Sequence, residues 1–290
     1  MISVIVPTKN EEANIGNCLE SLVKQTHKDF EVLVCDGGSI DKTQEVVNKF
    51  SKKIKVSFHK LKPDLGHQRR FGAKNANGDY LCFIDADMIL DPKVLEGCLL
   101  TISISTRRVE GVPPDGWKPG AVIIPEISFG QGFWAEVKAF ERKMYIGDDR
   151  VEAARFFAKE AYQKSGGWKE GMASGEDWDL TRRVKEVGFE VGRTNELIHH
   201  NEGRIYLSRT LKRKFYYAQK SKPFVEENVK GFKDYILFVF RPAYFRNWRE
   251  FIKHPVLGLA FCFMKSLEFS AGFLGMVSKN VVKTNYEKTK

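Results

Sequence analysis

Gly78-Asp79-Tyr80-Leu81-Cys82-Phe83-Ile84-Asp85-Ala86-Asp87-Met88 is a short apolar run that ends in two carboxylates one residue apart. Apolar and polar residues do not alternate between Tyr80 and Ile84, which is typical of a strand buried on both faces of a parallel sheet. Ligands of parallel sheets bind just beyond the carboxyl ends of the strands. We therefore predict a buried strand that delivers Asp85 and Asp87 to a ligand site.

Two aspartates at this spacing can both reach one hard cation. Mg²⁺ or Mn²⁺ held by one or two carboxylates keeps room for substrate phosphates, so the pair indicates a metal site for a diphosphate. The alternative is that Asp85 and Asp87 only cap the helix that Asp91-Pro92 starts. Because D-x-D is a common tripeptide, the choice depends on the rest of the chain.

Three further strands with polar ends come before this run. Strands are predicted over Ile2–Val6, Phe30–Cys35 and Lys53–His59, with helices over Ile15–Lys24, after Asp41 and over Gln68–Asn77. Four alternations of strand and helix predict an α/β fold, a right-handed, doubly wound and mostly parallel sheet.

The loops after successive strands of such a sheet converge at one edge. Thr8-Lys9-Asn10-Glu11, Asp36-Gly37-Gly38 and Asp85-Ala86-Asp87 should therefore share a crevice suited to a nucleotide. The spacing G-x-G-x-x-G is absent here, which argues against a nicotinamide dehydrogenase.

Four ordered motifs resemble those of the family 2 glycosyltransferases of GT-A fold, over about the first 205 residues. The motifs are Val6-Pro7-Thr8-Lys9-Asn10-Glu11, Val34-Cys35-Asp36-Gly37-Gly38-Ser39-Ile40-Asp41, Asn77-Gly78-Asp79-Tyr80 through Asp87, and Gly166-Gly167-Trp168 with Gly175-Glu176-Asp177-Trp178-Asp179-Leu180. The resemblance implies a nucleotide-diphospho-sugar donor, Mn²⁺ or Mg²⁺, and inversion at the anomeric carbon.

The resemblance also assigns roles to residues on the donor side. It implies that Pro7, Thr8, Asn10 and Glu11 line the nucleotide pocket, that Asp36 holds the base or ribose, and that Arg69 faces the donor. Asp85, Ala86 and Asp87 would take the ribose, the diphosphate and the metal, with Asp85 and Asp87 as metal ligands. This chain has Gln68-Arg69-Arg70 where the family usually has Ala-Arg-Asn.

A helix is predicted from Gly175-Glu176-Asp177 to about Val187, where Gly188 ends it. Acids in a first helical turn often serve only as caps or dipole partners. Displacement at a sugar carbon, however, needs a general base for the acceptor hydroxyl. The resemblance places this base at Asp177, with Glu176 as its supporting neighbour. A phosphate acceptor, already ionised, would need the base less.

Within the stretch Glu196 to Arg204, a short strand is predicted to end in two histidines, His199 and His200. A single histidine in such a place is more often packed or hydrogen-bonded than a ligand. The resemblance selects His200 as a third metal ligand. His199, one residue away, should face the other side of the strand.

The segment between these motifs is less informative. A strand is predicted over Ala121–Pro125, a turn at Pro113-Pro114-Asp115-Gly116, a helix over Glu136–Asp149 and a returning strand at Phe156-Phe157-Ala158. We assign no chemistry to these elements.

Composition sets the class and the compartment. The chain of 290 residues, 42% hydrophobic, is long enough for one substantial core and an appendage. Its five cysteines form no C-x-x-C pair, which favours a reducing compartment. The apolar start is too short for the core of a signal peptide, so we expect the catalytic part, residues 1–205, to stay on the cytoplasmic side.

Positive charge and aromatic residues are concentrated in the predicted appendage, residues 206–290. From Arg204 onward the chain has 18 Lys and Arg against 6 Asp and Glu, and 18 of its 36 aromatic residues. Such a composition indicates a nucleic acid or a membrane surface as partner, and no nucleic-acid-binding motif is present. We therefore predict membrane association and no nucleic acid.

Ser208–Ala218 is predicted to be a helix that interleaves basic and aromatic residues. Such a run is usually a solvated helix face. Because this helix follows His200 in the sequence, Arg209 or Arg213 would neutralise the leaving diphosphate or a phospholipid head group. We select Arg213 for this role. The segment departs from the basic motif of processive sugar synthases, so polymer synthesis is not expected.

Two apolar segments follow. Tyr235–Phe240 precedes Arg241-Pro242 and a group of aromatic and basic residues typical of the head-group level of a bilayer. Pro255–Ser278 is long enough to span a bilayer, which needs about 20 residues, but it contains Lys265 and Glu268, placed to pair on one helical face. An in-plane or re-entrant helix, a spanning helix, and a helix packed at a homodimer interface all remain open.

These observations together predict a metal-dependent inverting hexosyltransferase that acts on a lipid-linked acceptor, such as a polyprenyl or dolichyl phosphate or a glycan attached to one. The C-terminal segment resembles that of archaeal membrane-associated relatives, which points to GDP-mannose or UDP-glucose as donor. The alternatives are a soluble transferase that forms a small glycoside, and a catalytically dead scaffold that binds membrane or nucleic acid.

Overall fold

The computed structural model describes residues 1–103, 118–149, 151–169, 175–220 and 242–278. The predicted turn at Pro113–Gly116 and the apolar run Tyr235–Phe240 lie outside these residues. The chain forms two compact units, described separately below. Unit 1 comprises Met1–Glu126, Asp149–Gly171 and Glu176–Asn201, and unit 2 comprises Ile127–Asp148, Met172–Gly175 and Glu202–Lys290. The predicted functional division at residue 205 stays a prediction.

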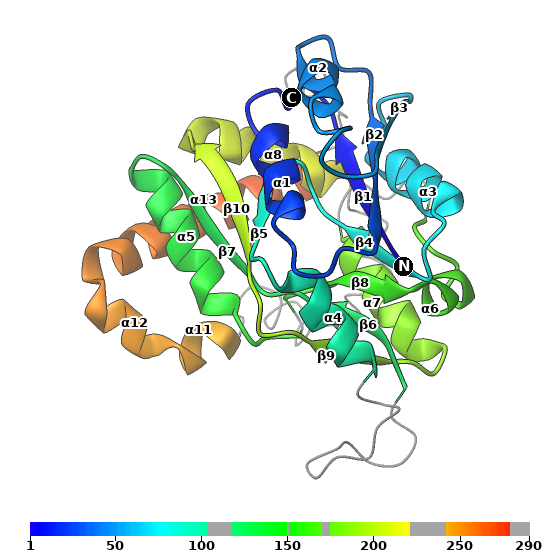
Figure 1. Cartoon of the computed structure of the whole chain (residues 1–290). Coiled ribbons are helices and arrows are strands. Elements are labelled where there is room, and N and C mark those ends of the chain that lie inside the picture. The colour runs from blue at the N-terminus through cyan, green and yellow to red at the C-terminus, as the bar shows by residue number, and fades with distance from the viewer. Residues whose placement is uncertain (104–117, 150, 170–174, 221–241, 279–290) are drawn as a thin grey trace. The chain divides into compact units, whose positions relative to one another are not determined.

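Unit 1 is built on a mixed sheet with the strand order β3-β2-β1-β4-β8-β6-β9 among the described residues. Its first four strands are parallel, and β1 lies between β2 and β4 (Figure 1). β8 is antiparallel to both of its neighbours, and β6 and β9 are parallel to each other. The strands are β1 Ile2–Thr8, β2 Phe30–Asp36, β3 Val56–Lys60, β4 Tyr80–Phe83, β6 Pro119–Ile123, β8 Ala154–Ala158 and β9 Glu190–Arg193. The mostly parallel α/β sheet predicted from the sequence is confirmed.

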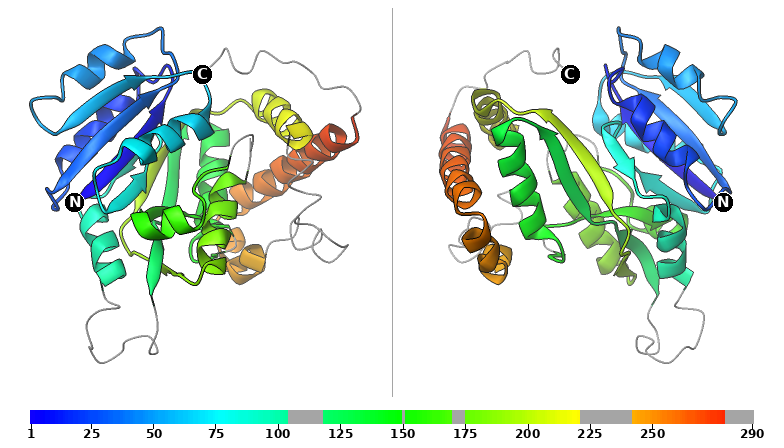
Figure 2. Two further views of the ribbon diagram at one scale, coloured as in Figure 1. Left: turned by 90° about the vertical axis from the view of Figure 1, so that its right-hand side faces the viewer. Right: turned by 60° about the vertical axis from the view of Figure 1, so that its left-hand side comes forward.

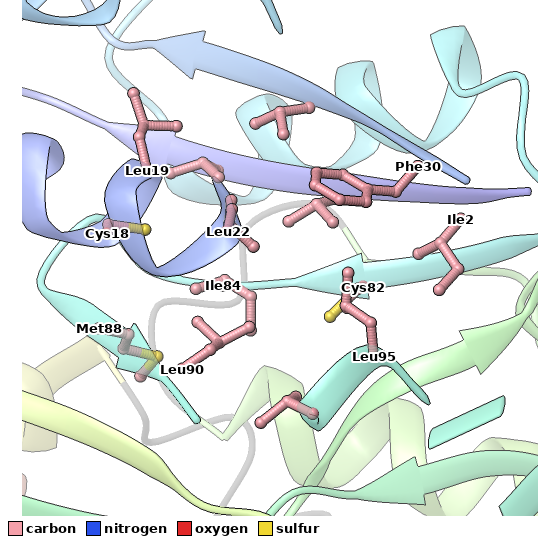
Figure 3. Close-up of a cluster of buried hydrophobic side chains, with 14 of the residues drawn as sticks. Ile2, Cys18, Leu19, Leu22, Phe30, Cys82, Ile84, Met88, Leu90 and Leu95 are labelled. Atoms are coloured by element: carbon pink, nitrogen blue, oxygen red, sulfur yellow. The ribbon is translucent and has the colours of Figure 1, made fainter. Parts of the chain in front are cut away.

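Helices cover both faces of this sheet because successive residues of each strand point to opposite sides. Ile2, Val4 and Val6 pack with α1 and α4 on one face, and part of this core is drawn in Figure 3. Ile5 and Leu33 pack with α3, α6 and α7 on the other. The helices of unit 1 are α1 Ile15–Val23, α2 Thr43–Asn48, α3 Leu65–Asn75, α4 Val94–Ser103, α6 Lys159–Lys164 and α7 Glu176–Glu186.

Among the helices of unit 1, the predicted bounds differ from the observed ones mainly at α3. This helix begins at Leu65, three residues before the predicted start, because Asp64 caps it and accepts a hydrogen bond from the His67 N–H. α7 ends where the sequence predicts, and Gly188 follows it with a φ of +88°.

A second sheet has the order β5-β10-β7, with β5 Met88–Leu90, β10 Ile198–Arg204 and β7 Glu126–Gln131. β10 pairs antiparallel with β5, which follows the Asp85-Ala86-Asp87 turn directly. His199 and His200 are therefore the second and third residues of β10. The prediction that they end a strand was wrong, because antiparallel pairing with β5 begins at Ile198 and the strand continues to Arg204.

Unit 2 has a helical core of its own. Its helices are α5 Phe133–Tyr145, α8 Leu207–Lys220, α11 Pro242–Arg246, α12 Trp248–Lys253 and α13 Pro255–Val277. Phe261 and Met264 of α13 pack with Val137, Phe140 and Met144 of α5. α13 lies along α8 as well as α5 (Figure 2). α13 therefore packs against both α5 and α8.

α13 has one buried and one exposed face. On the buried side, the Lys265 Nζ lies 2.5 Å from Glu141 of α5 and 2.6 Å from Glu268. Lys214 of α8 lies 3.9 Å from Glu268. The pairing of Lys265 with Glu268 was predicted, whereas the contributions of α5 and α8 were not. On the exposed side are apolar residues, namely Val256, Leu259, Phe263, Phe273, Leu274 and Val277.

Candidate active site

The ends of β1 and β2 are joined at the predicted nucleotide crevice. The Gln68 amide, buried at 5% exposure, donates to the Thr8 and Cys35 carbonyls, and the Gly37 N–H donates to the Thr8 carbonyl. Gln68 thus occupies the place where this chain departs from the family motif, and it fixes the loops after two strands. A side chain at Gly37 would meet the Gln68 amide at 3.2 Å.

The loop residues predicted to hold the nucleotide are brought together. The Asn10 and Glu11 N–H groups donate to Ser39 and Thr43 in the loop after β2, and the Asn10 side chain accepts from the Ile40 N–H. Asn10 has a φ of 54°, and this left-handed conformation turns the chain sharply after β1. Thr8, at the end of β1, has a buried hydroxyl without a hydrogen-bond partner among the described residues.

Asp36 closes its own loop. One carboxylate oxygen accepts from the Gly38 and Ser39 N–H groups at 3.0 and 2.8 Å, and the other accepts from the Ser39 hydroxyl. The side chain is 1% exposed, so its first effect is to shape the loop. Its role in holding the base or ribose stays a prediction.

Arg69 gathers three of the predicted site carboxylates. It is 3% exposed, and its guanidinium lies 3.1 Å from Asp85 and 3.2 Å from both Glu176 and Asp177. The guanidinium also lies over the Trp168 ring at 4.7 Å. Because the turn after β4 and the start of α7 each contribute acids to this one cation, Arg69 holds these two segments together.

Electrostatics separates the roles of the acids. Burial opposes the ionisation of Asp85, but Arg69 and Arg155 outweigh it and lower its pKa to about 2. Burial and the adjacent Asp177 raise the pKa of Glu176, although Arg69 opposes this. Asp85 is therefore a fixed anion, whereas Glu176 holds a proton more readily than an ordinary carboxylate.

Asp87 and His200 form the pair that fits a divalent ion. His200 Nε2 lies 3.4 Å from the Asp87 Oδ2, and the Asp87 Oδ1 is buried without a hydrogen-bond partner among the described residues. In the described part of the chain, no group of three or more His, Cys, Asp or Glu side chains is arranged to hold a metal ion. A carboxylate and an imidazole still suit Mn²⁺ or Mg²⁺ when donor phosphates complete the coordination.

Two site residues were not predicted. Arg155, on β8, lies 3.5 Å from the second oxygen of Asp85 and forms an ion pair with Glu126 at the start of β7. Neither lies in a motif. The one relevant sequence signal was the predicted strand at Phe156–Ala158. Arg155 directly precedes that strand and belongs to β8, which pairs with β4.

The remaining predicted residues are less informative. Pro7 pairs with Cys35 across β1 and β2, Ala86 is buried, and His199 bonds to Asp91 away from His200. Arg213 lies on α8 in unit 2. Its assignment to the leaving diphosphate stays a prediction.

The order of strands and the carboxylates at their ends define a GT-A-type domain of the glycosyltransferase class. The chain belongs to glycosyl transferase family 2, whose family model matches residues 3–146.

Among curated relatives, validoxylamine A glucosyltransferase of Streptomyces hygroscopicus subsp. limoneus is 32% identical over 105 residues, 34% of this chain and 23% of the relative. Chondroitin synthase of Pasteurella multocida is 27% identical over 199 residues, 65% of this chain and 19% of the relative. The chain thus spans about a fifth of the length of these relatives.

Solved structures support the fold. The mannosyltransferase PcManGT of Pyrobaculum calidifontis, in complex with GDP-Man and Mn²⁺, is similar with a TM-score of 0.62 at 14% identity, covering 96% of this chain and 88% of that one. TarS residues 1–349 of S. aureus give a TM-score of 0.52 at 19% identity, covering 95% and 90%. At these identities the likeness concerns the fold alone.

Proposed function

We propose that this protein is a metal-dependent inverting glycosyltransferase that moves a hexose from a nucleoside-diphospho-sugar onto a lipid-linked acceptor at a membrane surface. The observation that carries the proposal is the convergence of Asp85, Asp87, Glu176 and Asp177 around Arg69 and His200. GDP-mannose and UDP-glucose are the donors we favour.

The site residues divide the work in this proposal. Asp87 and His200 would hold Mn²⁺ or Mg²⁺, which supplies positive charge against the charge that develops on the leaving diphosphate. Asp85, the third predicted metal ligand, pairs with Arg69 and Arg155, and its part in metal binding stays a prediction. The loops around Thr8, Asn10 and Asp36 would take the nucleoside, with Pro7 and Glu11 also lining the pocket.

Asp177 is the proposed general base. Its carboxylate is 36% exposed, more than any other acid at Arg69, so it can accept a proton from an acceptor hydroxyl. The oxygen of the acceptor hydroxyl then bonds to the anomeric carbon of the sugar. The bond between this carbon and the diphosphate oxygen breaks at the same time, and its electron pair leaves with the nucleoside diphosphate. A lipid phosphate, already ionised, would attack without the proton step.

The apolar face of α13 supports a membrane acceptor. α13 is the one helix, among those the structure describes, that is long and apolar enough to cross a bilayer. Its charges, however, pair inward with Glu141 and Lys214. A transmembrane position of α13 would break these ion pairs. We therefore propose that α13 lies in the plane of the membrane, with its exposed face in the lipid.

Ligand-induced stabilisation tests the donor site. The protein is heated with GDP, UDP, GDP-mannose or UDP-glucose, each with and without Mn²⁺. We expect Mn²⁺-dependent stabilisation by one nucleotide, about 2.7 kcal/mol at a hundredfold excess over its Kd. Asp87→Ala should abolish the Mn²⁺ dependence, because it removes one of the two proposed ligands.

Asp79→Ala serves as the control, since Asp79 lies just before β4, the strand that leads to Asp87, but is 81% exposed. Asp177→Asn should still be stabilised by donor and Mn²⁺ while losing transfer to a hydroxyl acceptor. Equal Mn²⁺ dependence in Asp87→Ala would contradict the metal assignment. No stabilisation of the wild type by any nucleotide would favour the dead-scaffold alternative.

A further inference from the structure

The two aspartates of the Asp85-Ala86-Asp87 turn are connected by a chain of side chains outside the turn. From Asp85, Arg155 leads to Glu126, Glu126 to His200, and His200 back to Asp87. All five residues belong to unit 1. Glu126 and Arg155 are 12% and 11% exposed, so this connection lies largely out of solvent.

The two imidazole nitrogens of His200 face different carboxylates. Nε2 lies 3.4 Å from Asp87, and Nδ1 lies 3.8 Å from Glu126 Oε2. The second separation is too long for a hydrogen bond, but a small rotation of either side chain would form one. The Oδ1 atom of Asp87 is buried without a hydrogen-bond partner among the described residues, which leaves it available to the proposed ion. Nε2 is the His200 nitrogen beside Asp87, so it is the one that faces this ion.

A histidine that binds a metal through one nitrogen must carry its proton on the other. Such histidines usually donate that proton to a carboxylate, which fixes the tautomer and the orientation of the ring. Glu126 stands where this acceptor is required. Arg155 pairs with the other oxygen of Glu126 and holds that carboxylate beside the ring.

We propose that Glu126, held by Arg155, is the positioning residue for His200, fixing the tautomer in which Nε2 binds the divalent ion together with Asp87. This inference rests on the proposed function, because it presupposes a metal at Asp87 and His200. It adds a carboxylate and an arginine, from β7 and β8, that no motif includes. It also explains why Glu126 is buried next to a histidine rather than paired with Arg155 alone.

The test measures Mn²⁺ binding by the purified full-length protein, in the presence of a nucleoside diphosphate, by electron paramagnetic resonance. Glu126→Gln should weaken Mn²⁺ binding about 10- to 100-fold, because the ring is no longer fixed in the ligating tautomer. Pulsed measurements on the wild type should show nitrogen modulation from a directly bound imidazole. That signal should fall in Glu126→Gln at equal Mn²⁺ occupancy.

Glu152→Gln is the matched control. Glu152 is 10% exposed and pairs with Arg193 at 2.7 Å, so its loss removes an equally buried carboxylate with an arginine partner but no histidine. It should leave both Mn²⁺ affinity and the nitrogen signal unchanged. If Glu126→Gln folds poorly, Glu126→Gln with Arg155→Met removes both charges together and should weaken binding to a similar extent.

The outcomes separate this inference from the function it rests on. Wild-type affinity and nitrogen signal in Glu126→Gln would overturn the role of Glu126 while leaving the metal site intact. Equal losses in Glu126→Gln and Glu152→Gln would show a structural effect only and would also overturn it. Wild-type protein that binds Mn²⁺ without any nitrogen signal, or not at all, would overturn both this role and the proposed Asp87–His200 site.

Discussion

Glu31 is a carboxylate at the second position of β2, a strand buried along its whole length. It accepts hydrogen bonds of 2.8 Å from the Ser3 hydroxyl and the Asn77 N–H, and Lys55 lies 2.9 Å away. Burial opposes its ionisation, but the Asn77 and Lys55 partners outweigh it and lower the pKa to about 2. Glu31 thereby connects β2 to β1 and to the segment just before β4, the strand that leads to Asp85.

This residue makes stability depend on pH. A carboxylate whose pKa is lower in the folded state stabilises the fold above its unfolded pKa, and this contribution is lost as pH falls through the folded value. Between about pH 5 and pH 2, the wild type should therefore lose about 2 to 3 kcal/mol of unfolding free energy that Glu31→Gln does not lose. Urea unfolding across this range measures the difference.

Glu20→Gln provides the comparison, because Glu20 pairs with Lys53 at 3.1 Å but is 40% exposed. Its unfolding should follow the wild-type pH dependence. If Glu31→Gln also follows it, the hydrogen bonds to Glu31 do not hold its pKa down.

Some site residues were predictable and others were not, for a physical reason. Asp85, Asp87 and Asp177 lie at strand ends or helix starts inside recognisable motifs, so sequence position alone located them. Arg155 and Glu126 become site residues only because β8 runs antiparallel beside β4 and β7 follows β6. Nothing in the local sequence specifies that pairing.

α13 shows the same limit for a whole helix. The apolar pattern predicted a helix over Pro255–Ser278, one residue longer than the observed Pro255–Val277, and the pair Lys265 and Glu268 on one face. It did not predict Glu141, 124 residues earlier, which lies 2.5 Å from Lys265 and is 3% exposed. This partner turns two charges that would interrupt a membrane span into the attachment of α13 to α5.

Lys265→Met should accordingly destabilise unit 2. The variant leaves Glu141 and Glu268 buried without their nearest cation, a change that costs about 3 to 5 kcal/mol when one partner of a buried pair is removed. The expected result is a loss of that size in urea unfolding. Adding Glu141→Gln to Lys265→Met should recover part of the lost free energy of unfolding, since it removes the buried carboxylate of Glu141, which had lost its nearest cation.

Lys253→Met tests whether any lysine of this region would do. Lys253 pairs with Glu250 at 2.8 Å but is 64% exposed, so its replacement should leave the unfolding midpoint near that of the wild type. Equal effects of Lys265→Met and Lys253→Met would mean that the buried ion pairs do not hold α13 in place.

At the scale of the whole molecule, charge and apolar surface are distributed unequally along the chain. Residues 204–290 carry the excess of positive charge, while the first 203 residues are slightly acidic. Besides the exposed apolar residues of α13, α12 carries Trp248 and Ile252, which are 53% and 67% exposed. Arg249 and Lys253 lie beside them in the sequence. An apolar face bordered by basic residues suits the head-group region of an anionic bilayer.

Vesicle binding by the full chain tests this surface. Wild-type protein should float with phosphatidylcholine vesicles that contain phosphatidylglycerol, and less with phosphatidylcholine alone, and high salt should reduce the difference. Leu259→Glu with Phe263→Glu should lower partitioning at least about tenfold, since burying one such side chain contributes about 1.5 to 3 kcal/mol. Leu100→Glu, on α4 and 57% exposed, should have no effect.

Two further measurements separate the alternatives for α13. An in-plane helix that keeps Lys265 paired with Glu141 should be extracted from membranes by alkaline carbonate, whereas a spanning helix should resist extraction. Wild-type protein that ignores both kinds of vesicle, but sediments as a dimer that Leu259→Glu with Phe263→Glu dissociates, would assign the apolar face to a second copy of the chain. Since the face is the same in both cases, only these outcomes decide between lipid and protein as its partner.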